Sequence, residues 1–308
     1  MPKAYVFTRY GGPEAEALVD VDRPRPGPGQ VLIAVRAAGV NPVDFKLRTG
    51  YRRPGESGER EFPAYFGSEV AGVVEETGPG VDGFAAGDEV FGRPVVGGWS
   101  QCALLSVDLI ARKPAGVTFT DAATLPVAAS TAYAGVRQLG LAPGATVLVT
   151  GAGGGVGVAA VQIARALGLR TVGVASDGKK DLVESLGAVH VSSGPGWTER
   201  ARIAAPDGID GIYDLVGGDV LAEAATLRAA SAGLVTAAAP PDDAARLGGS
   251  RVARVRDNAV LEAVAELVAN GDLDPLVTRT FPLERAGEAL RVVEAGHARG
   301  KTVIEVAA

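Results

Sequence analysis

The chain has 308 residues, 47% of them hydrophobic and 21% charged, which is the balance of a globular protein long enough for two domains. Its formal net charge is −6 and it has no run of basic residues, so nucleic acid is excluded as an expected partner. A single cysteine, Cys102, and two histidines exclude an intrachain disulfide, a cysteine-rich zinc lobe and a histidine-rich metal site.

The first 117 residues carry short apolar segments separated by glycine and proline turns. Strands are predicted at 4–7, 30–40 and 67–75, another after Phe84 and one more from about residue 97. Many short strands at regular spacing are typical of a small β-barrel. Cys102 falls in the last of these strands, where a small buried residue is a better interpretation than a catalytic thiol.

A short helix is expected where Asn41-Pro42-Val43-Asp44 follows the second long strand, ending near Gly50. Asp44 is expected to cap this helix rather than to act in catalysis. The polar segment 52–61 is expected to be a surface loop. No apolar signal core follows Met1, so we expect a cytoplasmic protein without a membrane partner.

From Thr118 onward the pattern changes to alternating helices and strands. A helix capped by Thr120-Asp121 and interrupted at Pro126 comes first. Strands are then predicted at 146–150, 170–175, 188–191, 210–216 and 233–238, with helical segments in between. This alternation predicts a doubly wound parallel sheet.

The most informative stretch joins the strand 146–150 to a helix through Ala152-x-Gly154-x-x-Gly157. Strand, glycine turn and helix form the context in which glycines bind the pyrophosphate of a dinucleotide at a helix N-terminus. A tight turn that binds nothing is one alternative. A membrane helix over 144–164 is another, which the central glycines and nearby Arg165 disfavour.

The C-terminal part is predicted to return to the β-rich domain. Helices are expected at 257–270 and up to Gly296, and a last strand at 301–306. The domains are therefore predicted as 1–117 with 256–308, and 118–255. The ligand is expected in the cleft between them, at the carboxyl ends of the parallel strands.

The end of the second strand bears on the choice of nucleotide. An NAD site normally has a carboxylate there, whereas this chain has Ala175-Ser176, followed by Lys179 and Lys180. A hydroxyl with ammonium groups suits the 2′-phosphate of NADP(H). Asp177 could instead be a displaced acid, and the lysines could be solvated helix charges.

Several short motifs together resemble one family from end to end. They are Pro28-Gly29-Gln30-Val31, Gly39-Val40-Asn41-Pro42-Val43-Asp44, Gly67-Ser68-Glu69-Val70-Ala71-Gly72, Gly87-Asp88-Glu89-Val90, Leu125-Pro126, Thr131-Ala132-Tyr133, Asp214-Leu215-Val216-Gly217-Gly218 and Gly300-Lys301-Thr302-Val303. The chain resembles the zinc-independent medium-chain dehydrogenases/reductases of the quinone oxidoreductase, or zeta-crystallin-like, branch. The resemblance implies a GroES-like barrel split around a Rossmann domain, often in a homodimer. By analogy with the fold, residues 233–239 could extend the sheet across a two-fold axis.

The same resemblance implies hydride transfer without a metal. Zinc relatives have Cys where this chain has Asn41, His where it has Ser68, and a third ligand near Val127. Asn, Ser and Val cannot supply a catalytic zinc site of nitrogen and sulfur ligands. Members of this branch use NADPH to reduce quinones or the double bond of an enone.

Individual site residues follow from the resemblance, position by position. Two are candidate catalytic residues, Asn41 near the nicotinamide and Tyr51 near the quinone pocket, each able to donate a hydrogen bond to a developing oxyanion. The others are expected to bind the cofactor: Thr131 beside it, Gly154, Gly155 and Val156 at the pyrophosphate, Ser176 and Lys179 at the 2′-phosphate, and Val216 and Gly217 under the nicotinamide ribose. In the family a tyrosine commonly binds this phosphate. The corresponding position in this chain lies near Gly194, so that contact is missing.

Three of these residues have purely structural roles as alternatives. Asn41 could be a turn residue before proline, Tyr51 a loop-packing residue and Thr131 a helix-packing residue. The function predicted is NADPH-dependent reduction of a small electrophile, a quinone or an α,β-unsaturated carbonyl. An enoyl-thioester reductase of the same fold and a non-catalytic NADPH-binding protein remain the alternatives.

Overall fold

The computed structural model describes residues 1–307 except 53–55, 57, 230–231, 254–256 and 297–298. The chain forms two compact units, one of residues 1–127, 256–269 and 277–308 and one of residues 128–255 and 270–276. Helix α2 (Phe119–Ala122) packs on strands of the first unit, which places the division after Val127 rather than at 118. Residues 270–276 join the second unit, where the amide of Gln162 bonds both backbone polar groups of Asp274.

The first unit is built on a sheet of strand order β14-β15-β3-β5-β6-β7, and an added β3–β7 pairing closes four of these strands into a barrel. This confirms the predicted small barrel. Apolar residues alternate along β3 so that Val31, Ile33 and Val35 enter the barrel core. The strands are β3 (Gln30–Val40), β5 (Val70–Thr77), β6 (Glu89–Val96), β7 (Cys102–Arg112), β14 (Val277–Pro282) and β15 (Lys301–Glu305).

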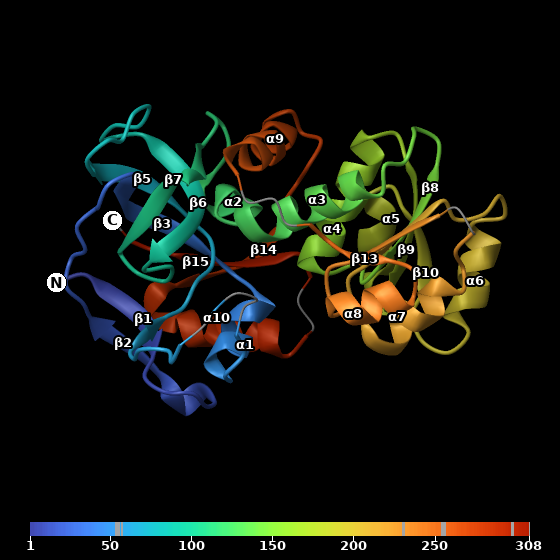
Figure 1. The fold of residues 1–308 in the computed structure, drawn as a ribbon, viewed down its shortest axis with the longest axis horizontal. Helices are drawn as coiled ribbons and strands as arrows, with labels where there is room; N and C mark the ends of the chain where they lie inside the picture. The colour runs from blue at the N-terminus through green and yellow to red at the C-terminus, as the bar shows by residue number, and fades with distance from the viewer. Residues whose placement is uncertain (53–55, 57, 230–231, 254–256, 297–298, 308) are drawn as a thin grey trace. The chain divides into compact units, whose positions relative to one another are not determined.

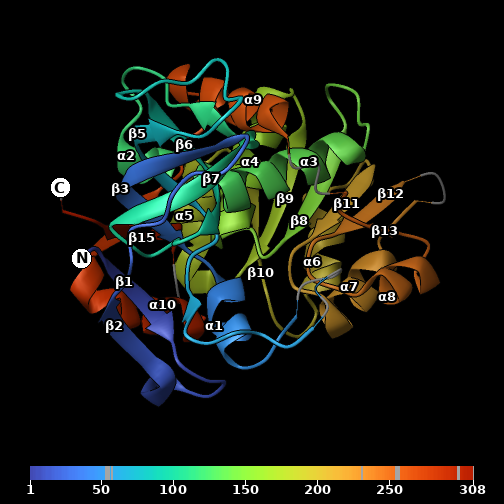
Figure 2. The same cartoon turned by 60° about the vertical axis from the view of Figure 1, so that its left-hand side comes forward.

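A smaller sheet extends this unit. Strands β2 (Glu16–Asp20), β1 (Lys3–Phe7) and β4 (Ala64–Tyr65) pair in that order, and β1 and β2 lie side by side in Figure 2. Three buried rings join it to the barrel, because Phe66 lies 4.9 Å from Phe7 and 5.0 Å from Trp99 between ring centres. Strand β2 was not predicted, since its residues are only partly buried.

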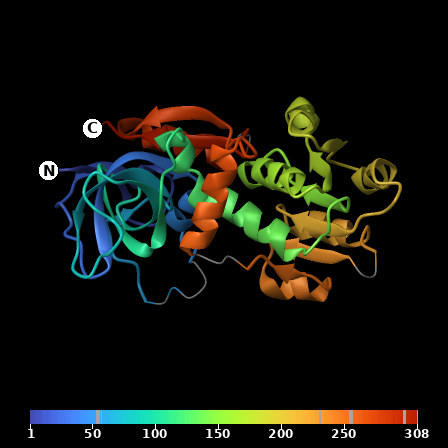
Figure 3. The same ribbon diagram turned by 90° about the horizontal axis from the view of Figure 1, so that it is seen from above.

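The C-terminal segment completes the first unit, as predicted. Strand β15 pairs with β3 antiparallel and with β14 parallel, so the red strands lie beside the blue barrel strand in Figure 3. Helix α9 (Asn258–Ala269) packs on β7, and α10 (Ala286–Glu294) packs on β14 and β15. Strand β14 escaped prediction because its side chains are mostly exposed and follow no clear alternation.

The second unit, coloured green to orange in Figure 1, contains a parallel sheet of strand order β10-β9-β8-β11-β12-β13. Counted from its first strand this is the order 3-2-1-4-5-6 of the Rossmann fold, which confirms the predicted doubly wound sheet. The strands are β8 (Thr146–Thr150), β9 (Arg170–Ala175), β10 (Val189–Ser192), β11 (Gly211–Asp214), β12 (Gly233–Thr236) and β13 (Ser250–Arg251). Because β12 lies between β11 and β13, residues 233–239 are not an edge, which corrects the expectation that they extend the sheet.

Helices cover the two faces of this sheet. Leu148, Val172 and Ile212 alternate with neighbours that face the other way, and they pack against α6 and α7. On the opposite face, Gly173 approaches Val183 of α5 and Tyr213 approaches Gly135 of α3. The helices are α3 (Ser130–Gln138), α4 (Gly155–Ala166), α5 (Lys180–Ser185), α6 (Trp197–Ala204), α7 (Gly218–Ala225) and α8 (Pro241–Arg246).

Helix boundaries follow the capping residues closely. The N-cap of α2 is Thr118, whose hydroxyl accepts the Asp121 N–H at 3.1 Å, and not the predicted Thr120-Asp121. The predicted interruption at Pro126 is confirmed, because a π-helical turn over Leu125–Ala129 separates α2 from α3. Gly168 adopts φ +73°, the left-handed conformation expected after α4.

No helix in the described part of the chain is long and apolar enough to cross a membrane. The uncharged stretch 144–164 forms strand β8 and most of helix α4, divided by the glycine turn.

The contact of α3 with the sheet depends on Gly135. A Cβ there would lie 2.2 Å from Cζ of buried Tyr213, whose hydroxyl donates to the Thr131 carbonyl at 2.7 Å. We expect Gly135→Ala to lower the free energy of unfolding by about 1–3 kcal/mol, because overpacking outweighs alanine's better helix propensity. Urea unfolding measures the change. Gly178→Ala is the control, since a Cβ there meets nothing within 4 Å, and a Gly135→Ala protein as stable as wild type would contradict the packing account.

Candidate active site

Three strand ends of the first unit bring together an amide, a carboxylate and an ammonium group. The pairing of Thr302 with Val40 places Lys301 beside Asn41. The pairing of Ala38 with Val70 places Glu69 opposite Gly39 on the other side of β3, from where its side chain reaches Asn41. The three side chains belong to segments far apart in sequence, and the strand order β15-β3-β5 is what makes them neighbours.

We call these three side chains the Asn41 network. The Lys301 Nζ lies 2.7 Å from Asn41 Oδ1 and 2.9 Å from Glu69 Oε1. Asn41 Nδ2 donates to the same Glu69 oxygen at 2.8 Å, and the Val127 N–H donates to Glu69 Oε2 at 2.7 Å. Asn41 and Lys301 are each 4% exposed and Glu69 is 0% exposed, so the ion pair is desolvated and each charge depends on the other.

Gly39 makes room for this network. A Cβ on Gly39 would lie 2.1 Å from Glu69 Oε1 and 2.7 Å from the Ala123 carbonyl oxygen. Glycine is therefore required where the Glu69 carboxylate crosses the backbone of β3. The π-helical turn that ends at Ala129 contributes the Val127 N–H on the other side of the carboxylate.

Asp44 holds the backbone of Asn41. Its Oδ2 accepts the Asn41 N–H at 2.8 Å, and its Oδ1 accepts the Ser68 hydroxyl at 3.2 Å. Asp44 is fully buried at the start of α1 (Pro42–Arg48). The predicted capping role of Asp44 is thus confirmed, and the same contact fixes the turn from which the Asn41 side chain projects.

The residues at the expected zinc positions do not fit that metal. The Asn41 amide is engaged by Lys301 and Glu69, and the Ser68 hydroxyl donates to Asp44. Val127 offers only its backbone N–H. Among the described residues there is no group of three histidine, cysteine, aspartate or glutamate side chains suited to a metal ion. The ammonium of Lys301 supplies the positive charge beside Glu69.

Tyr51 lies apart from Asn41. Asn41 precedes α1 and Tyr51 follows it, so the two are at opposite ends of a seven-residue helix about 10 Å long. Tyr51 is 40% exposed and its N–H donates to the Lys46 carbonyl. The predicted surface loop 52–61 includes residues 53–55 and 57, which lie outside the described part of the chain.

In the second unit the glycine turn opens helix α4 as predicted. Gly154 is the N-cap, and a Cβ on Gly157 would lie 2.3 Å from the Gly151 carbonyl oxygen. Gly157 therefore allows the helix to pack against the turn, while the space above Gly154 is open except for one oxygen at 3.4 Å. The first-turn N–H groups of Gly155 and Val156 point out of the helix end, an arrangement that fits a pyrophosphate.

Ser176 and Lys179 lie next to this turn. They follow β9, which pairs with β8, and Lys179 packs its aliphatic chain on Gly153. Ser176 is exposed and Lys179 is half-buried. Asp177 is exposed in the same 3₁₀ turn. The Ser176 hydroxyl, the Lys179 ammonium and the Asp177 carboxylate therefore all follow the end of β9.

Arg200 is a residue that the sequence analysis did not single out. Its guanidinium donates to the carbonyls of Ser192 and Gly194 at 2.9 and 3.2 Å. Ser192 is the register partner of Ala175, the last residue of β9. A cation therefore lies near Gly194, the position at which the phosphate-holding tyrosine of the family is missing.

Asp214 begins the motif Asp214-Leu215-Val216-Gly217-Gly218, and its role could not be predicted from the sequence. Its fully buried carboxylate accepts the hydroxyls of Thr150 at 2.7 Å and Thr236 at 2.6 Å. It also accepts the N–H groups of Val216 and Gly217 at 3.2 and 3.0 Å. The carboxylate thus fixes the turn after β11, where Val216 is 51% exposed and Gly217 has φ +80°.

Thr131 and Cys102 complete the set of predicted positions. Thr131 lies in the first turn of α3 and is 4% exposed, and its carbonyl accepts the Tyr213 hydroxyl. Cys102 is buried at the start of β7, as predicted, and burial raises the pKa of its thiol. A raised pKa disfavours the thiolate that nucleophilic chemistry requires.

Two family models match the chain. The alcohol dehydrogenase GroES-like domain matches residues 27–115, and the zinc-binding dehydrogenase matches residues 186–304. Both the closed barrel and the Rossmann strand order agree with these matches.

Similar proteins cover most of the chain. NAD(P)H oxidoreductase RTN4IP1, mitochondrial, of Bos taurus is 32% identical over 91% of this chain and 82% of its own length. The 2-methylene-furan-3-one reductase of Solanum lycopersicum is 31% identical over 98% of this chain and 78% of its own length. The solved structure of the quinone oxidoreductase from Coxiella burnetii has a TM-score of 0.90 and 29% identity, covering 99% of each chain. The chain therefore belongs to the medium-chain dehydrogenase/reductase family and is an oxidoreductase with GroES-like and Rossmann domains.

The Asn41 network generates a prediction about stability. Lys301→Met leaves the Glu69 carboxylate buried without its counter-charge, which is expected to cost about 3–5 kcal/mol in urea unfolding. The double variant Lys301→Met with Glu69→Gln removes both charges and should cost less than the sum of the single changes. Lys3→Met is the control, because the Lys3–Asp20 pair is exposed and worth about 1 kcal/mol at most. If the losses in free energy of unfolding from Lys301→Met and from Glu69→Gln simply add up in the double variant, the two charges are not coupled.

Proposed function

We propose that the protein is an NADPH-dependent reductase that transfers hydride to a quinone or an α,β-unsaturated carbonyl without a metal ion. The main support for a quinone or enone as the hydride acceptor is the Asn41 network. In this network a fixed amide occupies the position where zinc relatives have a metal ligand. The similarity to a quinone oxidoreductase and to a 2-methylene-furan-3-one reductase supports this acceptor class. The homodimer expected from the resemblance belongs to this proposal, and light scattering in solution tests it.

The chain's own residues would hold the cofactor as follows. The N–H groups of Gly155 and Val156 would bind the pyrophosphate, and Ser176 and Lys179 the 2′-phosphate. Val216 and Gly217 would support the nicotinamide ribose, with Thr131 beside the cofactor, and Asn41 of the first unit has the role at the nicotinamide that the resemblance implies. When bound, the nicotinamide supplies the hydride. The Asp214 contacts to Val216 and Gly217 keep that part of the site in shape before the cofactor arrives.

Asn41 is proposed to stabilise the charge that develops on the acceptor. Its Oδ1 accepts from Lys301 and one Nδ2 hydrogen goes to Glu69, and the second Nδ2 hydrogen, which has no acceptor among the described residues, is available to a ligand. Such a preorganised donor lowers the energy of an enolate or phenolate oxygen in the transition state. The ammonium of Lys301 is engaged by Glu69 and by Asn41, so the final proton is assigned to water or to Tyr51.

Cofactor oxidation with a panel of acceptors tests this function. The panel contains quinones, α,β-unsaturated ketones and a short 2-enoyl thioester, each with NADPH and with NADH. The proposal expects turnover with the first two classes. Preference for the thioester would favour the enoyl-thioester reductase, and tight NADPH binding with no turnover would favour the binding protein.

Replacing the candidate catalytic residues separates their roles. Asn41→Ala is expected to lower kcat/KM about 10²–10³-fold, because it removes a donor to the developing oxyanion. Tyr51→Phe is expected to have a smaller effect, since its exposed hydroxyl can be replaced by water. Fluorescence titration should show NADPH still bound in both variants. Unchanged turnover in both would remove these residues from the mechanism.

Cofactor preference depends on the turn after β9. Ser176→Ala combined with Lys179→Gln is expected to raise KM for NADPH by about tenfold or more, since two contacts to a dianionic phosphate are lost, while KM for NADH stays unchanged. Lys180→Gln is a matched control, because Lys180 is exposed and faces Glu184 at 4.0 Å. Equal effects on NADPH and NADH would show that these residues do not bind the 2′-phosphate.

A further inference from the structure

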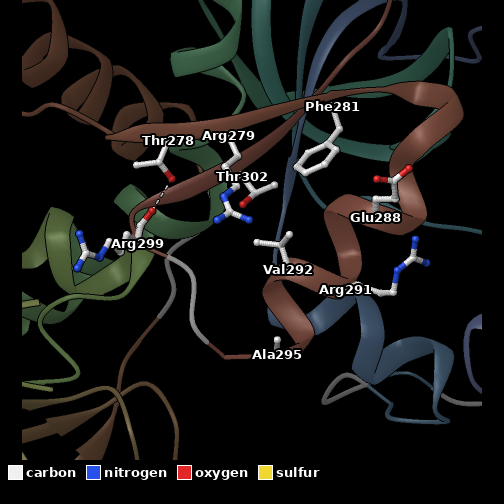
Figure 4. Close-up of a pocket in the computed structure, with 9 residues that line it drawn as sticks. All are labelled: Thr278, Arg279, Phe281, Glu288, Arg291, Val292, Ala295, Arg299 and Thr302. Atoms are coloured by element: carbon white, nitrogen blue, oxygen red, sulfur yellow. Dashed lines mark hydrogen bonds between the residues drawn. The ribbon is translucent and has the colours of Figure 1, made fainter. Parts of the chain in front are cut away.

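A hollow in the first unit lies between helix α10 and strands β14 and β15 (Figure 4). It has a volume of about 860 Å³, within the usual range for sites that bind small molecules. Its wall combines three arginines, two threonines, one glutamate and an apolar strip. These residues are Thr278, Arg279, Phe281, Glu288, Arg291, Val292, Ala295, Arg299 and Thr302.

Two regular elements, strand β14 and helix α10, supply most of these side chains. Arg279 is the register partner of Thr302, and Phe281 lies two residues further along β14 on the same face. On α10 the lining residues are Glu288, Arg291, Val292 and Ala295, the i, i+3, i+4, i+7 stripe of one helix face. A single strip of the helix thus faces a single strip of the sheet.

The hollow is separate from the Asn41 network. Successive residues of a strand point to opposite faces. Lys301 bonds Asn41 and Glu69, whereas its neighbour Thr302 lines the hollow. The network and the hollow therefore use opposite faces of β15.

Two of the arginines that line the hollow carry positive charges without an ion-pair partner in the described part of the chain. The guanidinium groups of Arg279 and Arg291 have no carboxylate within 4 Å there. Elsewhere on this acidic chain arginines do pair, for example Arg23 with Glu75 and Arg170 with Asp207.

The one carboxylate in the wall does not cancel these charges. Glu288 accepts two hydrogen bonds from Arg285, at 2.7 and 2.6 Å, and Arg285 lies outside the lining. This bidentate contact holds the pKa of Glu288 below its usual range and neutralises its charge locally. Glu288 is also close enough to Arg291 for their charges to attract, but both of its hydrogen bonds within the described ranges go to Arg285, so the donors of Arg279 and Arg291 are available to an entering anion.

The apolar part of the wall adds a second requirement. Phe281 and Val292 are half-buried, and Ala295 extends the same strip along α10. In Figure 4 the Phe281 ring and Val292 lie toward the Arg279 and Thr302 side chains. A small inorganic anion would leave this surface in contact with water, whereas a hydrocarbon chain would cover it.

We propose that this hollow binds an amphiphilic organic anion, a carboxylate or phosphate monoester carried on a hydrocarbon chain. Arg279 and Arg291 bind the anionic head, and Phe281 and Val292 contact the chain. This ligand is additional to the nicotinamide cofactor and to the acceptor proposed above, and the inference is independent of both.

Isothermal titration of the full chain tests the proposal with three probes: octyl phosphate, octanoate and inorganic phosphate. At least one amphiphile is expected to bind ten or more times as tightly as inorganic phosphate, and the better of the two identifies the head group. Arg279→Gln combined with Arg291→Gln is expected to weaken that binding about tenfold or more. Both arginines are exposed, so the variant should fold, and its thermal unfolding checks this.

Two controls make the result decisive. Arg246→Gln removes one exposed arginine that pairs with Asp243 in the second unit, and should leave binding unchanged. Val292→Ser should weaken the amphiphile and leave inorganic phosphate unaffected. The proposal is overturned by no binding of either amphiphile, by inorganic phosphate binding equally well, or by equal binding in the double arginine variant. Loss of NADPH affinity in that variant would assign the guanidinium groups to the nucleotide and likewise overturn it.

Discussion

The ion pair between Lys301 and Glu69 is the interaction on which the first unit's candidate site depends. Two opposite charges removed from water are tolerable only when they compensate each other and all their hydrogen bonds are made. Here the ammonium also bonds Asn41, and the carboxylate also accepts the Val127 N–H. The pair therefore fixes the Asn41 amide, and it explains why the C-terminal strand must return to the barrel, since only β15 brings Lys301 to this position.

The second unit uses a buried carboxylate for a similar purpose. Asp214 is satisfied by two threonine hydroxyls and by the backbone of the turn that it holds. In each unit a fully buried carboxylate, Glu69 or Asp214, accepts hydrogen bonds from polar groups at the ends of neighbouring strands. Leaving either acid without its donors would cost the desolvation energy of a charged group, so the turns are held in one conformation.

Sequence patterns predicted the local elements well because their causes are local. The strand at Gln30–Val40, the strand at Arg170–Ala175 and the glycine turn before α4 all follow from periodicity and glycine placement. The parallel sheet followed from the alternation of elements. Strand β14 was missed because its polar, exposed side chains give no alternating pattern.

The parts that could not be predicted depend on contacts between distant segments. Glu69 and Lys301 are separated by 232 positions, and only the strand register shows that they meet. The resemblance gave Asn41 and Tyr51 as two candidate catalytic residues, and only the structure shows that they lie at opposite ends of helix α1. Arg200 and Asp214 gained interpretable roles only through the side chains and backbone groups around them.

We propose that a fixed amide, and no metal ion, assists hydride transfer to a conjugated acceptor. The decisive experiment uses NADPH with deuterium at both C4 positions and follows the label into a cyclic enone by mass spectrometry, after exhaustive treatment of the enzyme with a chelator. We expect deuterium at the β-carbon of the saturated ketone, in equal yield with and without chelation. An unlabelled product, or a reaction abolished by the chelator and restored by zinc, would overturn the proposal.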